Sequence, residues 1–360
     1  MLFSFCFLFF LQCDLLAQVQ YMLSEGSTVY HPLLASLLVT FILGTIGLFI
    51  SRLLSWLPLR MKASAWFLPF LLVGVLTRWH FPQFGDVSGA AGWAPVIVLL
   101  LLYFVWVFVL QLFFDSSKEN ATLSTYLWPN MVQLIAFTMI CVGLSNTDIV
   151  LHRTLKAVRL IEEQNYEEVL QAARHERHPS RQLSAATALA LSNTGQLGEA
   201  LFAYPQPYGS EGLLPTLADT SLFVNLPLAV GHHLGYKKGD RTSATFFLEV
   251  IDTMPRRRPA VRDYLLCAHL LDKKLDCFVE RLQTDSLSVS SLPRHYREAL
   301  LLVPDALPHA PCPMPDDSLK AAFDQFRSIL SNGQSRDERE FLAQQQFGTT
   351  YWYYYYFGKR

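Results

Sequence analysis

Residues 92–114, GWAPVIVLLLLYFVWVFVLQLFF, form an apolar run without one Lys, Arg, Asp or Glu. A hydrocarbon core about 30 Å thick is crossed by roughly 20 helical residues, and a globular core does not need so long an unbroken run. The run therefore predicts a membrane-spanning helix. It restricts the possible folds of this chain more than any other stretch does.

The charged residues divide the chain sharply in two. Residues 1–147 hold five basic and five acidic side chains, whereas residues 148–360 hold the other 24 basic and 25 acidic ones. We expect a transmembrane helical domain over 1–147, followed by a water-soluble part that is long enough to bury its own core. The formal net charge of −1 gives no electrostatic reason to expect nucleic acid as a partner.

Four further apolar segments extend the membrane prediction. Gly44 and Gly47 share one face of the second segment and permit close helix packing there. The third segment is short and contains Pro69, but Trp66 and Trp79 bracket it as interfacial aromatic residues do. The predicted bundle therefore has about five spans, at 2–21, 33–50, 63–79, 92–114 and 126–145.

The first segment has two alternative interpretations. A signal peptide fits poorly, because the segment lacks a basic start and a small-x-small cleavage site. A lipoprotein signal ending at Cys13 also fits poorly, because Phe10, Leu11 and Gln12 are not the small residues that the peptidase requires. We prefer a first span with Asp14 near one interface. The abrupt, uncharged start is consistent with a longer natural N-terminus.

The loops give conflicting signals on topology. Arg52, Arg60 and Lys62 lie in one short loop, which favours a cytoplasmic position for that loop. With five spans, the C-terminal part then lies outside the cytoplasm. Three basic residues just after the fifth span favour the opposite side: Arg153, Lys156 and Arg159. Long domains cross the membrane largely regardless of their charge, so the short loop receives more weight.

Four polar side chains in or near the predicted spans are candidates for a transport or proton-relay site: Asp14, Gln111, Asn130 and Gln133. Only Asp14 is ionisable, and no basic residue in any predicted span offers it a partner. Helix packing and interfacial polarity are the plainer explanation for these residues.

From residue 151 onward, short amphipathic helices alternate with polar turns. Four helical hairpins are expected, with turns near residues 165, 195, 239 and 274. The turn spacing, about 30 to 44 residues, is close to the 34-residue period of tetratricopeptide repeats, which these hairpins resemble. No hairpin carries the full repeat signature. The resemblance implies a degenerate, all-α solenoid over 148–303, with a concave surface suited to a protein or peptide partner.

Residues 304–360 form a third region, which differs from the helical hairpins in composition. Five prolines in 304–318 predict a linker or strap, and 319–330 predict an amphipathic helix. Residues 351–357, YWYYYYF, are consecutive aromatics that should not remain in water. They are expected either to cap the end of the repeat array or to rest at the membrane interface, and we favour the cap.

The histidines give only a weak metal signal. His175 and His178 flank Glu176, but no HExxH pattern is present and Pro179 ends the helix. His232 and His233 are adjacent, so their rings are expected to point to different faces. The six cysteines form no CxxC pair and predict no disulfide framework.

Recognised catalytic and nucleotide-binding motifs are absent from the sequence, including GxSxG, GxxxxGK[ST] and GxGxxG. We therefore predict a non-enzyme with no catalytic, cofactor-binding or metal-binding residues. Arg256, Arg257 and Arg258 lie between two prolines at a turn between hairpins. They would suit an anionic partner or lipid headgroups, although a solvated turn is the plainer interpretation.

Three stretches carry a wider resemblance: DLLAQVQ at 14–20, ALALSNTGQLGEALFAYPQPYGSEGLLPT at 188–216 and TTYWYYYYFGKR at 349–360. In these, the chain resembles a family of uncharacterised membrane proteins from Bacteroidota with several N-terminal spans and a tetratricopeptide-like domain. The resemblance implies a multi-pass protein of the bacterial inner membrane. Five spans with a cytoplasmic basic loop then make the periplasm the expected side of the C-terminal domain. The resemblance implies no activity.

We predict a membrane-anchored interaction or assembly scaffold, whose partners are the lipid bilayer and a protein or peptide bound to the repeat surface. The alternative is a membrane transporter or membrane-embedded enzyme that uses the helical repeats as a regulatory domain. An excess of charge within the spans or paired inverted repeats would favour that alternative, and neither is evident in the sequence.

Overall fold

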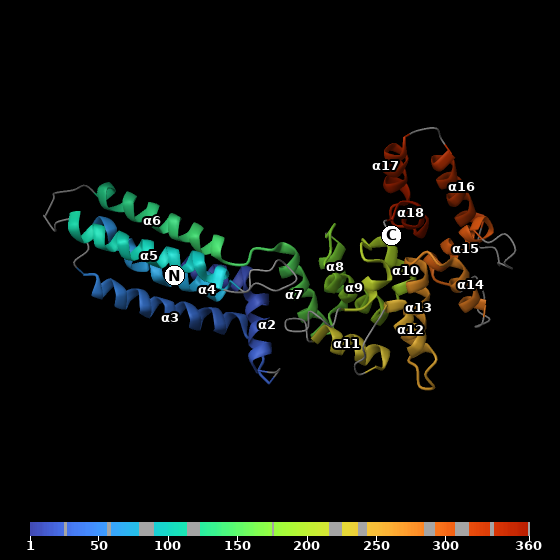
Figure 1. The fold of residues 1–360 in the computed structure, drawn as a ribbon, viewed down its shortest axis with the longest axis horizontal. Helices are drawn as coiled ribbons and strands as arrows, with labels where there is room; N and C mark the ends of the chain where they lie inside the picture. Colours follow the sequence, from blue (N-terminus) through green and yellow to red (C-terminus); the bar gives the residue numbers. More distant parts are fainter. Residues whose placement is uncertain are drawn as a thin grey trace. The chain divides into compact units, whose positions relative to one another are not determined.

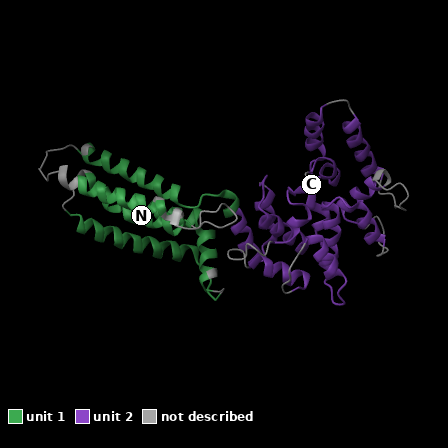
Figure 2. Ribbon diagram, viewed as in Figure 1, with its two compact units in different colours: residues 1–152 green, residues 153–360 purple. Residues whose placement is uncertain are grey.

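The computed structural model describes residues 1–24, 27–55, 59–78, 90–113, 123–174, 176–215, 225–236, 243–283, 292–306, 317–331 and 335–358. Within these ranges every regular element is a helix, in agreement with the predicted all-α class (Figure 1). The chain divides into two compact units, Met1–His152 and Arg153–Arg360 (Figure 2).

The first unit begins with a bent helical segment where the sequence predicts one continuous span. Its parts are α1 (Leu2–Cys6), a π-helical turn η1 (Phe7–Leu11) and α2 (Cys13–Ser24). The axis bends by 69° at Gln12. The buried Gln12 side chain donates a 3.0 Å hydrogen bond from Nε2 to the carbonyl oxygen of Asn146. This contact to a residue far along the chain holds the bend in place.

The remaining helices of the first unit surround an aromatic core. The short helix α4 packs against three neighbours, α3, α5 and α6. The ring of Phe67 stacks on Tyr103 with centroids 4.6 Å apart, and it meets Phe137 edge-on at 5.2 Å. The bounds of these elements are α3 (Pro32–Leu53), η2 (Leu59–Trp66, a 3-10 helix), α4 (Phe67–Leu76), α5 (Ala90–Phe113) and α6 (Leu123–Leu144).

Polar side chains of α6 hold the 3-10 helix η2 in place. Asn130 Oδ1 accepts a 2.7 Å hydrogen bond from the backbone N–H of Ala63, and Gln133 Oε1 accepts one of 2.7 Å from the Ser64 hydroxyl. On the other side, a Cβ added at Gly47 would lie 2.6 Å from the ring of Trp66. Gly47 thus permits the close packing that the sequence predicts. Asn130 and Gln133 act as packing residues.

Two helices of the first unit are long and apolar enough to cross a membrane: Pro32–Leu53 and the Tyr126–Leu144 part of α6. The bent N-terminal pair would make a third span. Met61–Leu76 and Val96–Val109 are shorter apolar helices within the part of the chain that was searched. The full prediction of five spans is therefore not confirmed. Trp79 and the loop around Lys118 lie outside the described residues.

Large apolar side chains face outward along these helices. A water-soluble bundle would bury such side chains, whereas a bilayer solvates them. More than half of each of the following side chains is exposed: Leu34, Leu38, Phe41 and Phe49 on α3, Leu101, Phe104 and Phe108 on α5, and Leu127, Met131, Ile135 and Met139 on α6.

The second unit is a succession of short helices, and α7 crosses the boundary between the two units. Several of these helices begin at hydroxyl caps, because a Ser or Thr oxygen satisfies a backbone N–H that has no partner within the helix. The elements are α7 (Ile149–Glu162), α8 (Tyr166–Arg174), α9 (Arg181–Asn193), α10 (Leu197–Ala200), η4 (Leu201–Ala203), η5 (Gly209–Leu213), α11 (Asn225–Leu234), α12 (Ala244–Asp252), α13 (Pro259–Leu271), α14 (Leu275–Gln283), α15 (Arg294–Ala306), α16 (Asp317–Ser331), α17 (Arg336–Phe347) and α18 (Tyr351–Phe357).

The same turn recurs after four of these helices. The left-handed residues at the turns are Gln164 (φ 57°), Gly195 (φ 69°), Gly235 (φ 82°) and Lys273 (φ 58°). In each case the following N–H bonds to a carbonyl five residues earlier, as in the Schellman motif. Three of the turns lie at predicted positions, and the spacing between successive turns is 31, 40 and 38 residues.

The hairpins differ from the prediction in two places. The return helix of the second hairpin, α10, is only four residues long and continues as the 3-10 turn η4. In the third hairpin, the chain leaves α11 at Gly235, before the predicted turn at 238–240, which lies outside the described residues. The hairpins therefore share a turn geometry but not a helix length.

Candidate functional site

The outer face of α12 and the turn just after it expose large apolar side chains. Phe246 and Val250 lie one turn apart on the helix and are 58% and 41% exposed, and Met254, two residues beyond the end of α12 at Asp252, is 47% exposed. We call these three residues the α12 face. On the neighbouring helix α11, Leu228 is also largely exposed. A group of exposed large apolar side chains is typical of a surface that binds another protein.

The inner face and both ends of α12 are firmly held. Glu211 accepts a 2.7 Å hydrogen bond from the backbone N–H of Ala244, and the Ser243 hydroxyl caps the first turn. Thr245 donates a 2.7 Å hydrogen bond to Asp272, next to the end of α13. These contacts fix the helix, so the α12 face is presented on a rigid support.

A buried ion pair ends α12 and shapes the basic turn after it. The Asp252 side chain is completely buried and pairs with Arg257 at 2.6 Å and with Arg281 of α14. Of the three consecutive arginines after α12, Arg257 links the turn to the helix through its ion pair with Asp252. Arg256 and Arg258 are exposed, so the turn is only partly solvated as predicted. This ion pair was not predicted from the sequence, because Arg281 is far from Asp252 along the chain.

The aromatic run 351–357 is a helix, α18, packed inside the second unit. Tyr351, Trp352 and Tyr354 are buried, and α18 packs on α15 and α17. The Trp352 indole N–H donates a 2.8 Å hydrogen bond to the carbonyl oxygen of Glu298. The aromatic run is therefore packed against other helices of the second unit.

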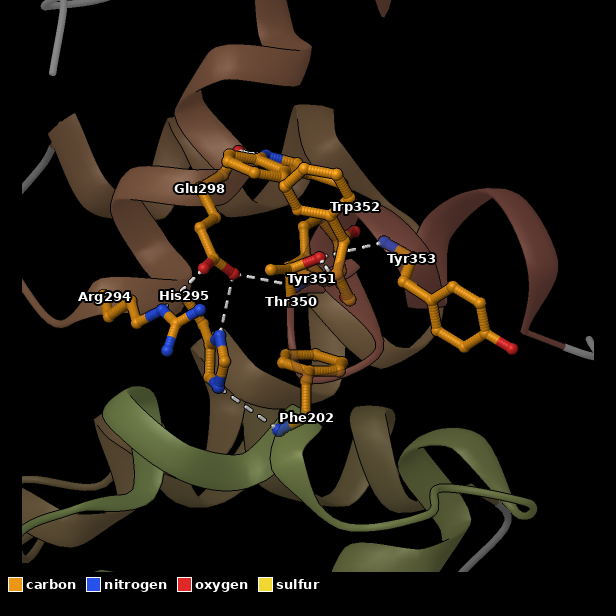
Figure 3. A network of polar contacts seen from close by, with 9 residues as sticks. Phe202, Arg294, His295, Glu298, Thr350, Tyr351, Trp352 and Tyr353 are labelled. Atoms are coloured by element: carbon orange, nitrogen blue, oxygen red, sulfur yellow. Dashed lines mark hydrogen bonds and ion pairs between the residues drawn. The ribbon is translucent and has the colours of Figure 1, made fainter. Parts of the chain in front are cut away.

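A buried polar network fixes the start of α18 (Figure 3). The Glu298 carboxylate accepts hydrogen bonds from the backbone N–H of Tyr351 at 2.7 Å, from Arg294 at 2.7 Å and from Nδ1 of His295 at 2.9 Å. Burial alone raises the pKa of Glu298, but the hydrogen bonds from His295 and Tyr351 and the charge of Arg294 outweigh it. The net result is a pKa below the ordinary value, so the carboxylate is ionised at neutral pH.

The buried pair of His295 and Glu298 resembles part of a catalytic dyad, but its hydrogen bonds indicate a structural role. The backbone N–H of Phe202 donates to His295 Nε2 at 3.3 Å, so the ring proton is on Nδ1 and points at Glu298. Both ring nitrogens are therefore engaged inside the core. The pair positions α15, α18 and the turn at Phe202 relative to one another.

The other histidines flagged in the sequence are dispersed. His175 lies outside the described residues, and Glu176 pairs with Arg153 while accepting a hydrogen bond from the His178 backbone. His232 is exposed, whereas the ring of His233 meets the Ser192 hydroxyl at 2.7 Å. Among the residues that the structure describes, no three His, Cys, Asp or Glu side chains gather as a metal site.

Comparison with protein families gives one match. A model described as a family of unknown function (DUF6057) matches residues 1–245 and 233–358, which together leave out only the last two residues. The chain belongs to this family. DUF6057 is an uncharacterised family, as the sequence resemblance implies. No curated protein and no solved structure gives a significant match to this DUF6057 chain.

Proposed function

We propose that this DUF6057 protein is a membrane-anchored scaffold whose helical repeats bind a segment of a partner protein. The recurrence of one turn geometry at Gln164, Gly195, Gly235 and Lys273 carries the proposal. Repeats with equivalent turns stack side by side and form an extended binding surface, which is the usual role of tetratricopeptide-like solenoids. The role is binding and assembly, and catalysis is not part of it.

The α12 face is the binding surface in this proposal. Phe246 and Val250 are spaced by one helical turn and Met254 extends the row past the helix end, so they match a partner helix or extended peptide that carries apolar anchors. Burying such anchors in a water-excluding contact provides most of the affinity of a small interface. A partner with an apolar stripe is therefore the expected ligand.

The anchor in this proposal is a five-span bundle in a bacterial inner membrane, with the repeats in the periplasm. Helix length supports the fourth of these spans and leaves the third one short. Arg60 and Lys62 of η2 belong to the loop, so the third span keeps residues 63–66 of η2 and the ten residues of α4, which rise about 8 Å and 15 Å against a hydrocarbon core of roughly 30 Å. The 24 residues of α5 rise about 36 Å.

A site-specific photocrosslinking experiment tests the binding role. A photoreactive amino acid at Val250 of the full chain, expressed in its native host, should form one discrete adduct, and Phe246→Glu should abolish that adduct. The same amino acid at exposed Gln325 on α16 is the matched control and should not form it. Adducts of equal pattern from both positions, or an adduct unaffected by Phe246→Glu, would refute binding at the α12 face.

Reporter fusions test the topology separately. Alkaline phosphatase fused after residue 360 should be active in a bacterial host, because five spans place the repeats in the periplasm. A fluorescent fusion with inactive phosphatase would instead show an even number of spans and cytoplasmic repeats. That outcome would refute the proposed topology and leave the crosslinking result unaffected.

A further inference from the structure

A cavity of about 430 Å³ lies beside the start of α13, within the second unit. Its volume falls within the range of roughly 300–1,000 Å³ that is common for small-molecule sites. Its lining is partly basic and partly apolar, and we call the three arginines the rim and the apolar side chains the floor. The residues involved are Arg257, Arg258 and Arg262 on the rim, and Leu266, Leu292, Pro293 and Tyr296 on the floor, together with Pro259 and Asp263.

The rim carries an excess of positive charge. Asp252 is fully buried and paired with two arginines, Arg257 and Arg281, which leaves one positive charge over at that cluster. Asp263 interacts electrostatically with Arg262. Arg258 is exposed and has no carboxylate partner among the residues that the structure describes. Counting these four arginines and two aspartates gives a net charge of two.

The start of α13 adds to this positive potential. Pro259 occupies the first turn, the N-cap residue Arg258 contributes no side-chain cap, and the first turn contains no acidic residue. The helix dipole therefore favours an anion at this end of the helix. The dipole only reinforces the arginines, which supply the specific contacts.

The floor of the cavity favours a ligand that is larger than an inorganic ion. The Tyr296 hydroxyl is occupied, since it donates a 3.3 Å hydrogen bond to the carbonyl oxygen of Asp263, so this residue presents its ring and not its hydroxyl. Leu266, Leu292 and Pro293 add only apolar atoms. A bare phosphate would leave much of this space unfilled.

We propose that this cavity binds a phosphate monoester, with the phosphate on Arg258 and Arg262 and a small organic part over Leu292 and Pro293. A guanidinium group binds phosphate oxygens through two parallel N–H bonds, and a dianion matches the excess positive charge around the cavity. A phosphorylated small metabolite and the headgroup of phosphatidic acid carry the same chemistry. This site is independent of the α12 face.

Calorimetric titration of the full chain in a non-ionic detergent tests the site, with glycerol 3-phosphate as the probe and glycerol as the neutral control. Glycerol 3-phosphate should bind saturably with one site per chain, and glycerol should not bind. Arg258→Gln should weaken binding about tenfold, because one charge-assisted contact is lost. Arg256→Gln removes the same charge two residues away, outside the cavity lining, and should change affinity less than about twofold.

The proposal is overturned if glycerol 3-phosphate does not saturate, or if the two arginine variants weaken binding equally, since the latter means a diffuse basic surface. A second arm repeats the titration in nanodiscs with and without phosphatidic acid. Loss of the binding signal with phosphatidic acid supports the lipid headgroup as the source, and an unchanged signal supports a soluble phosphate ester. Failure of this site would leave the crosslinking result at Val250 standing, so the two proposals fail separately.

Discussion

The hydroxyl of Tyr354 donates a 2.9 Å hydrogen bond to the carbonyl oxygen of Leu271, the last residue of α13. The hydroxyl of Tyr351 does the same to Leu270 at 3.1 Å. The last carbonyls of a helix have no partner within that helix. The aromatic helix α18 therefore caps α13. Lys273 strengthens the contact by donating to the carbonyl oxygen of Gly358 at 2.8 Å and by lying over the Tyr354 ring.

Removing either capping hydroxyl should destabilise the second unit. Tyr354→Phe removes the hydrogen bond to the Leu271 carbonyl oxygen, which costs about 1 kcal/mol and lowers the melting temperature by roughly 2–4 °C for a unit of this size. Tyr351→Phe should cost less, because the Leu270 carbonyl oxygen keeps a hydrogen bond from the Lys273 N–H. Thermal unfolding in detergent measures the effect. Tyr353→Phe is the control, because its hydroxyl makes no hydrogen bond within the described residues, and it should change the melting temperature by less than about 1 °C. Equal shifts for all three variants would contradict the capping role.

The ionised Glu298 should make stability fall in acid. Its pKa is lower in the folded chain than its ordinary value of 4.5, so its contribution is complete above that value and is lost as pH falls through the folded pKa. The loss of melting temperature between pH 7 and about pH 3 should therefore shrink in Glu298→Gln. Exposed Glu167→Gln is the matched control and should retain the wild-type pH dependence. A Glu298→Gln profile parallel to that of the wild type would contradict this assignment.

Substitutions at two equivalent turns, Gly195 and Gln164, should change the stability of the folded chain in opposite directions. Gly195→Ala forces a Cβ into a left-handed conformation, at a cost of about 1 kcal/mol, although the added atom meets nothing within 4 Å. Gln164→Gly removes the same strain and should stabilise by about 0.5 kcal/mol, because the more flexible unfolded chain offsets part of the gain. Thermal melting of both variants tests this, and shifts of the same sign would show that the two turns are not equivalent.

Removing Asp252 should cost less stability than removing the two arginines that pair with it. Asp252→Asn leaves Arg257 and Arg281 free to turn toward water, since their side chains are already 44% and 35% exposed, and it should cost about 1 kcal/mol. Replacing both arginines by Gln leaves a buried carboxylate without a partner and should cost about 3 kcal/mol or more. Denaturant unfolding compares the two. A larger loss for Asp252→Asn than for the double variant would show that the buried charge is not the dominant effect.

Local signals in the sequence predict much of the helical pattern. The apolar runs identify α3 and α6, and the polar turns identify the hairpins at Gln164, Gly195 and Lys273. A positive φ is signalled by glycine at position 195. At Gln164 and Lys273 the polar surroundings give the position of the turn. They do not give its left-handed backbone conformation, because Gln and Lys also occur often inside helices.

Contacts between distant residues explain what the sequence does not predict. The bend at Gln12 depends on a carbonyl at Asn146, 134 positions away. Glu298 looks like an ordinary member of a charged helix pair with Arg294 until Tyr351 brings its backbone N–H to the same carboxylate. Periodicity reports which side of a helix is apolar, but not which partner will cover it.

The hydrogen bonds from α18 to α13 also bear on the order in which the chain is made. The partners of Leu270 and Leu271 lie 81 and 83 residues downstream. A ribosome therefore completes α13 well before it synthesises the tyrosines that cap it. Until those tyrosines emerge, the end of α13 and the pocket that holds Trp352 stay open to solvent. During synthesis, this is the interval in which a chaperone or protease has access to the interior of the second unit.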